Sequence, residues 1–102
     1  MKHLVFAYGT LRDPVVRNTV IGRKVHTKTD FLQGYCMEEI FLDGKTYPII
    51  NKSVVSKNPV RGEVFEVFTN ELRLIDIYES EAYKREKVIL ASGREAWVYV
   101  KP

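Results

Sequence analysis

One acidic residue of this 102-residue chain, Glu79, stands where a carboxyl group could carry protons. It ends the segment Glu71–Glu79, which has helical spacing and follows Thr69-Asn70, residues typical of a helix cap. Residues advance about 100° around a helix, so Glu79 falls between the apolar Leu72 and Ile75, on the flank that should meet the core. A carboxyl group among apolar neighbours has a raised pKa, which suits proton transfer near neutral pH. The spacing alone leaves open a helix-end glutamate that faces solvent.

The loop Tyr8–Leu11 is the second candidate. It follows Leu4–Tyr8, a nearly all-apolar segment typical of a buried strand, and precedes a helix start at Asp13-Pro14. Gly9 has no Cβ, so its backbone can take unusual conformations and a ligand can approach it closely. Successive N–H groups in such a turn, near a helix start, favour a carboxylate or a phosphate. A strand followed by a glycine turn also occurs for structural reasons alone, and the residues leave both interpretations open.

The elements that must position these residues are short. Asp13 as cap, Pro14 at the first helical position and Gly22 after Ile21 predict a helix that ends at Ile21. Asp43-Gly44 and Ser92-Gly93 each predict a hairpin turn. The predicted strands after the first are Lys28–Gln33, Tyr35–Leu42, Tyr47–Asn51, Val60–Phe68, Arg85–Leu90 and Glu95–Val100. Six or seven strands with two short helices predict an α+β fold, a small mixed β-barrel, in one domain over residues 1–102.

Composition excludes several classes of protein. The 16 basic residues are scattered among 13 acidic ones, so the net charge of +3 indicates a solvated surface and not a nucleic-acid-binding stripe. Cys36 is the single cysteine, which rules out an internal disulfide and favours a reducing cytoplasm. No apolar run approaches the roughly 20 residues of a membrane span, and no signal peptide is visible. With two histidines and one cysteine, we expect no metal and no cofactor.

Taken together, the motifs resemble those of the gamma-glutamylcyclotransferase-like family. The resemblance covers nearly the whole chain, and its pieces occur in the same order as in the family. The segments that carry it are Phe6–Arg12 (a Y-G-T-L loop), Tyr47-Pro48-Ile49, Val60–Phe65, Ile75–Ser80 with Tyr83-Lys84-Arg85, and Ala96–Val100. Ser80 departs from the pattern, because the family often has glycine there. The chain resembles the compact members, including the gamma-glutamylamine type.

The resemblance implies a role for six residues. It implies that Tyr8, Gly9, Thr10 and Leu11 bind substrate through backbone groups, and that Glu79 is the proton acceptor. We expect Tyr83 to contact the substrate site and to orient Glu79 through a hydrogen bond. Asp76 lies one helical step toward the polar side, and its substitution by asparagine is expected to leave turnover nearly intact.

The activity implied is the cyclisation of a small-molecule gamma-glutamyl amine or peptide to 5-oxoproline, with release of the amine. Two alternatives stay open. The first is a non-catalytic binding or interaction module of the same fold. The second is a small basic barrel that binds nucleic acid, which would need a one-sided stripe of cations with exposed aromatic residues. The sequence determines neither the amine half of the substrate nor the oligomeric state.

Overall fold

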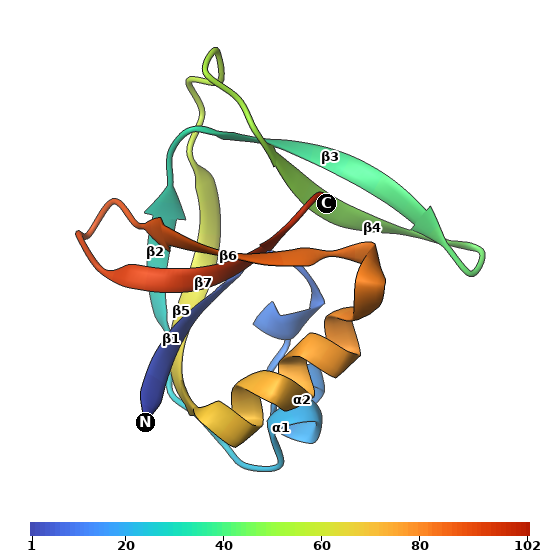
Figure 1. Ribbon diagram of the computed structural model, residues 1–102, viewed down its shortest axis with the longest axis vertical. Coiled ribbons are helices and arrows are strands. Elements are labelled where there is room, and N and C mark those ends of the chain that lie inside the picture. The colour runs from blue at the N-terminus through green and yellow to red at the C-terminus, as the bar shows by residue number, and fades with distance from the viewer.

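The computed structural model describes residues 1–102 as seven strands and two α-helices, with two short 3₁₀ turns. Five strands form one sheet in the order β2-β5-β1-β7-β6, while β3 and β4 pair only with each other (Figure 1). The strands are β1 Lys2–Ala7, β2 Lys28–Leu32, β3 Tyr35–Leu42, β4 Lys45–Lys52, β5 Val60–Phe68, β6 Lys84–Ile89 and β7 Glu95–Val100; the helices are α1 Pro14–Ile21 and α2 Thr69–Glu79.

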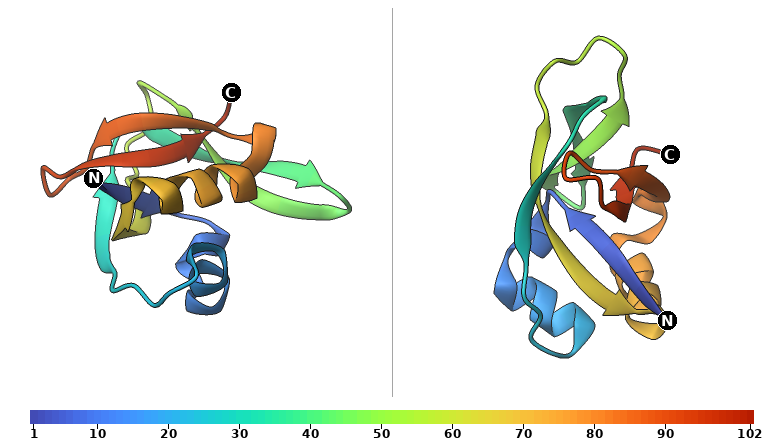
Figure 2. Two further views of the ribbon diagram at one scale, coloured as in Figure 1. Left: turned by 60° about the horizontal axis from the view of Figure 1, so that its bottom comes forward. Right: turned by 90° about the vertical axis from the view of Figure 1, so that its left-hand side faces the viewer.

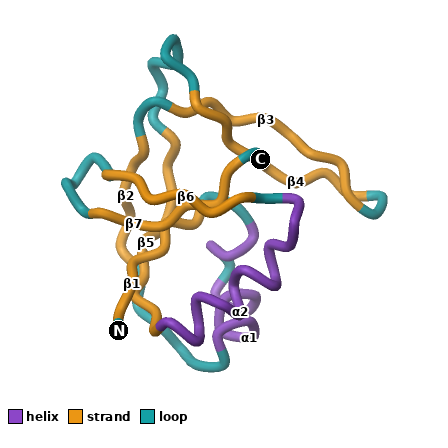
Figure 3. Tube along the Cα trace, viewed as in Figure 1, coloured by secondary structure: helices purple, strands orange, loops and turns teal.

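Strand β1 is the centre of the molecule and is buried on both faces. It pairs antiparallel with β5 and parallel with β7. Side chains alternate along a strand, so Phe6 joins the core on the side of the β3–β4 hairpin, while Val5 and Ala7 join the core under the helices. Figure 3 shows both helices away from that hairpin, and in the right-hand view of Figure 2 they lie on either side of β1 and β5. The end of β1 therefore emerges where all three parts of the fold meet.

Local residues set both ends of α1, as the sequence predicts. The Asp13 carboxylate accepts a hydrogen bond from the Val15 amide at 2.9 Å, and Pro14 occupies the first turn. Gly22 ends the helix with φ of 89°, a left-handed conformation that glycine adopts without steric cost.

The start of α2 differs from the predicted Thr69-Asn70 cap. Phe68 is the N-cap residue, and Glu71 reaches back to accept from its amide at 2.8 Å. Glu71 also pairs with Arg23 at 2.6 Å. The Thr69 hydroxyl instead hydrogen bonds with His3 at 2.9 Å. A carboxylate three residues into a helix can satisfy the cap amide, so no hydroxyl was needed there.

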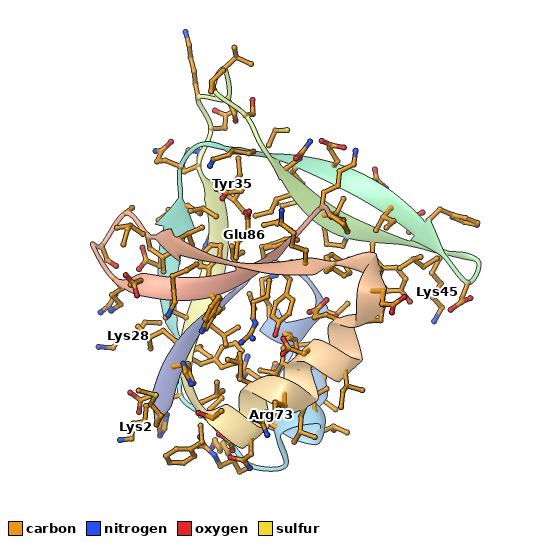
Figure 4. The ribbon with its side chains drawn as sticks, in the orientation of Figure 1. Lys2, Lys28, Tyr35, Lys45, Arg73 and Glu86 are labelled. Atoms are coloured by element: carbon orange, nitrogen blue, oxygen red, sulfur yellow. The ribbon has the colours of Figure 1, made fainter.

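The α+β fold class is confirmed, but the predicted barrel does not close. The carbonyl of Pro48 in β4 accepts from the Tyr83 hydroxyl at 2.9 Å, so this edge of β4 faces outward from its hairpin. Proline has no N–H to donate, so Pro48 cannot donate a backbone hydrogen bond to the main sheet. Only isolated bonds join the two sheets, such as Lys101 N–H to the Ile50 carbonyl at 2.9 Å. Another runs from the Tyr35 hydroxyl to the Glu86 carboxylate at 3.3 Å; both residues are labelled in Figure 4.

The two edge strands of the main sheet approach each other at one end. Buried Asp30 of β2 accepts from the Ser92 hydroxyl and amide and from Arg94 at 3.3 Å, all in the β6–β7 turn. The Ala91 amide donates to the Phe31 carbonyl at 2.8 Å. Burial raises the pKa of Asp30, but hydrogen bonds from Ser92, Phe31 and Arg94 outweigh it and hold the pKa below its usual value. The sheet is therefore curved like a barrel wall, but it is open along most of its length.

Gly62 in β5 lets the two central strands pack tightly. A Cβ there would lie 2.5 Å from the Ala7 carbonyl oxygen and 2.7 Å from the Phe6 ring. We expect Gly62→Ala to lower the free energy of unfolding by about 1–3 kcal/mol through overpacking, measured by urea denaturation. Arg61→Ala, on the exposed neighbour, is the control and should change it little. Equal midpoints for both variants would contradict this account.

Candidate active site

A cavity lies at the end of β1, between the C-terminal end of α2 and strand β4. All six residues singled out from the sequence line it. The lining residues are Val5, Phe6, Ala7, Tyr8, Gly9, Thr10, Leu11, Tyr47, Pro48, Glu79, Tyr83 and Tyr99. The loop and the helix end, about 70 residues apart in the sequence, therefore border one hollow.

Glu79 brings the only carboxyl group to this lining. It is the last residue of α2, and Leu72 and Ile75 on the same flank are buried, as the helical spacing predicts. Its carboxyl group makes no hydrogen bond or ion pair with the rest of the chain, and burial raises its pKa to about 7. A carboxyl group in this state is half protonated near neutral pH, so it can both accept and donate a proton.

The backbone just after Glu79 is strained. Ser80 has φ of 63° and ψ of −170°, a region that is essentially reserved for glycine. This is the position where the resemblance leads one to expect glycine. The Ser80 hydroxyl accepts from the Ala82 amide at 3.3 Å, which gives the turn a local support. Such strain costs about 1–3 kcal/mol and tends to occur at functional sites.

The loop that lines the cavity has free backbone donors. The Tyr8 and Gly9 amides donate to no other group of the chain, and the first bond of the following 3₁₀ turn runs from the Arg12 amide to the Gly9 carbonyl at 3.0 Å. Gly9 has φ of −113°, so it is not held in a left-handed conformation. A Cβ there would lie 3.4 Å from Pro48, in ordinary contact. Because Gly9 has no side chain, its backbone is not covered by one and a ligand can approach it closely.

The Tyr8 side chain fixes the loop and is not open to a ligand. Its hydroxyl donates to the Tyr99 carbonyl and accepts from the Ile50 amide at 3.3 Å. The residue is buried, and burial raises the pKa of its hydroxyl. The end of β1 is thereby tied to β7 and β4 at once.

Tyr83 lines the cavity, but the expected hydrogen bond to Glu79 is absent. The Tyr83 hydroxyl donates to the Pro48 carbonyl at 2.9 Å. A tyrosine hydroxyl has one proton, so none is left for Glu79. Burial, followed by the nearby Glu79 charge, raises the pKa of Tyr83 to about 12.

Sequence reasoning missed two supports of the site. Buried Arg17 of α1 donates to the Leu11 carbonyl at 3.2 Å and to the Arg12 carbonyl at 3.1 Å, which holds the loop from behind. Arg17 is four residues before Ile21, the other buried residue of α1, and this spacing could have placed both on the same inner helix face. Asp76 is the second, because its carboxylate accepts from the hydroxyl of Tyr99, which lines the cavity, at 2.6 Å. Asp76 is therefore linked to the site through Tyr99, although it does not line the cavity.

The amino-acid sequence from residue 5 to residue 102 matches the protein family described as gamma-glutamyl cyclotransferase, AIG2-like. This chain belongs to the AIG2-like gamma-glutamyl cyclotransferase family. It is 34% identical to AIG2-like protein A of Arabidopsis thaliana over 87 residues, which are 84% of this chain and 50% of that protein. The chain thus spans about half the length of this curated relative.

Solved structures show the same fold. A solution structure of an Arabidopsis thaliana protein has a TM-score of 0.79 at 29% identity, covering 99% of this chain and 62% of that one. A structure described as a gamma-glutamyl cyclotransferase has a TM-score of 0.74 at 20% identity, covering all of this chain and 68% of the other. At that identity the likeness shows the fold alone.

Two further observations concern other kinds of site. No three side chains among His, Cys, Asp and Glu are grouped so that they could hold a metal ion. Neither α-helix is long and apolar enough to cross a membrane.

Proposed function

We propose that this family member cyclises a gamma-glutamyl group to 5-oxoproline and releases an amine, with Glu79 as general base and then general acid. The observation that carries the proposal is the Glu79 carboxyl group, which lines the cavity, has no partner in the chain and has a pKa of about 7. One residue that is poised between its two protonation states can serve both proton transfers of this reaction.

The chemistry requires those two transfers. The substrate α-amine is an ammonium in neutral solution, and its nitrogen has no lone pair until a base removes a proton. Glu79 accepts that proton, the nitrogen attacks the γ-amide carbonyl carbon, and a five-membered lactam closes. The bond from this carbon to the other nitrogen then breaks, and Glu79 returns the proton to the leaving amine. The ring nitrogen, which began as an ammonium with three protons, still carries two at this stage. Glu79, ionised again, takes one of them and passes it to the released amine, which departs as an ammonium ion. Atoms and charge then balance without any further reactant.

The loop supplies the geometry for ring closure. The amides of Tyr8 and Gly9 have no partner in the chain, and Thr10 and Leu11 begin the 3₁₀ turn. These N–H groups suit the substrate carboxylate. Holding that carboxylate at the loop and the amine at Glu79 would force the folded conformer, and such positioning supplies much of the rate in intramolecular reactions. The Tyr8 and Arg17 hydrogen bonds keep the loop rigid while it does so.

Direct assay of a substrate panel tests this function. The protein is incubated with gamma-glutamyl amines, gamma-glutamyl dipeptides and glutathione, and 5-oxoproline is measured by chromatography. We expect product from at least one of the amines or dipeptides, and product formation about 10²- to 10⁴-fold slower with Glu79→Gln. If no compound yields 5-oxoproline while 5-oxoproline itself still binds, the chain is a binding module of the same fold.

Product binding should occur at the loop. We expect 5-oxoproline to shift the amide resonances of Tyr8–Leu11 in a ¹⁵N NMR titration, because its carboxylate would accept from these groups. Ser92 and Gly93, in the turn bonded to Asp30 of β2 and outside the cavity lining, should not shift. Shifts confined to residues outside the cavity would contradict the loop assignment.

A further inference from the structure

Asp76 is the only residue of α2 with a polar side-chain link to the β6–β7 part of the sheet. Its carboxylate accepts from the Tyr99 hydroxyl of β7 at 2.6 Å and pairs with Arg85 of β6 at 3.3 Å. The other side-chain bonds of α2 go elsewhere, for example from Tyr78 to Thr10 at 2.6 Å. Asp76 thus connects the helix that ends in Glu79 to the strand that forms the far wall of the cavity.

The two partners of Asp76 are themselves held in place. Arg85 and Tyr99 lie directly opposite each other in the β6–β7 ladder. The Arg85 guanidinium stacks 4.3 Å from the centre of the Trp97 ring. The Tyr99 carbonyl accepts from the Tyr8 hydroxyl, so the same residue also anchors the loop. Asp76 therefore contacts a rigid pair, and its position is determined from both strands.

Asp76 and Glu79 are three residues apart on α2, so they lie on adjoining parts of one helix face. A displacement of the helix end relative to β7 would move the Glu79 carboxyl group away from Tyr99 and from the loop that Tyr99 supports. The exposed side of the same wall is a shallow hollow lined by Asp76, Ser80, Tyr83, Arg85, Trp97 and Tyr99. Asp76 supports the wall from that outer side and does not reach the cavity lining.

We propose that Asp76 is a positioning residue, which acts through Tyr99 to hold Glu79 at its working distance from the Tyr8–Leu11 loop. The proposal rests on the proposed function of Glu79 but concerns a residue that touches neither substrate nor reacting atoms. A misplacement of about 1 Å can cost about 100-fold in rate, so one cross-link near the helix end is enough to matter.

A double-mutant cycle tests whether Asp76 acts through Tyr99. We expect Asp76→Ala and Tyr99→Phe each to lower kcat by about 10- to 100-fold with little change in KM. The double variant should lose no more than either single one, because both remove the same bond. Asp76→Asn keeps an oxygen that can accept from Tyr99, so it should restore most of kcat. Losses that multiply in the double variant, or no rescue by asparagine, would overturn the proposal.

A measurement without substrate separates this proposal from the proposed function. Amide hydrogen exchange of Asp76, Glu79 and Ser80 should be about tenfold faster in Asp76→Ala and in Tyr99→Phe, because a hydrogen bond to a charged group is lost. Arg73→Ala, at an exposed position of the same helix (Figure 4), should leave both exchange and kcat unchanged. If the parent is inactive but exchange is faster in both variants than in the parent, the proposed reaction is refuted and the positioning role stands. Unchanged exchange in both variants would refute the positioning role, whatever the activity.

Discussion

Glu79→Gln is expected to lower kcat by about 10²- to 10⁴-fold, toward the upper end of the usual loss of a general acid or base. The upper end is expected because one carboxyl group would serve both proton transfers. Glutamine has nearly the same size but cannot accept the ammonium proton. Binding of 5-oxoproline should change much less, since the loop amides would make the carboxylate contact. Turnover is measured by 5-oxoproline formation, and binding by calorimetry.

Glu81→Gln is the matched control for this experiment. Glu81 is exposed, lies two residues after Glu79 and makes no ion pair or hydrogen bond through its side chain. The same chemical change there should leave kcat and KM as in the parent. Asp76→Asn would be a poor control, because Asp76 is bonded to Tyr99. A Glu79→Gln variant as active as the parent would refute the acid–base role.

Activity should fall steeply on the acid side of neutral pH. Burial raises the pKa of Glu79 to about 7, and only the ionised carboxylate can act as the base. We expect kcat/KM to fall about tenfold for each pH step of one below 7, so that it is about 100-fold lower at pH 5 than at its plateau. A pH–rate profile measures this, with circular dichroism at each pH to show that the protein stays folded. An acid limb centred near pH 4.5 would mean that the titrating group has the ordinary pKa of a glutamate, which would contradict the raised pKa of Glu79.

The same shift links stability to pH. The pKa of Glu79 is raised in the folded state from an ordinary value of 4.5 to about 7, so the folded chain holds its proton more tightly. The resulting stabilisation is fully present below pH 4.5 and is lost as pH rises to about 7, by about 3 kcal/mol at most. Glu79→Gln should remove this contribution, and above pH 7 it should unfold at a higher urea concentration than the parent. Identical pH dependence of the two midpoints would contradict the buried carboxyl.

The amino-acid sequence by itself determined the elements whose signals are local. Asp13, Pro14 and Gly22 predicted both ends of α1, because capping and positive φ depend on residues within one turn. Asp43-Gly44 and Ser92-Gly93 predicted the two hairpin turns for the same reason. Helical spacing also favoured the inner flank of α2 for Glu79, but left a solvent-facing position open. The ordered motifs indicated the family, which the match over residues 5–102 shows.

Tertiary structure alone decided which partners the site residues have. The Tyr8 hydroxyl donates a hydrogen bond to the Tyr99 carbonyl, 91 positions away, and the Tyr83 hydroxyl donates one to the Pro48 carbonyl, 35 positions away. Asp76, which helical spacing places toward the polar side of α2, accepts from the Tyr99 hydroxyl, 23 positions away. The pairing of β3 and β4 in a separate sheet was likewise decided by tertiary structure. The residues next to a side chain in the sequence determine the direction in which it leaves the backbone. Its hydrogen-bond partner depends on how distant strands pack, and no local sequence pattern determines that packing.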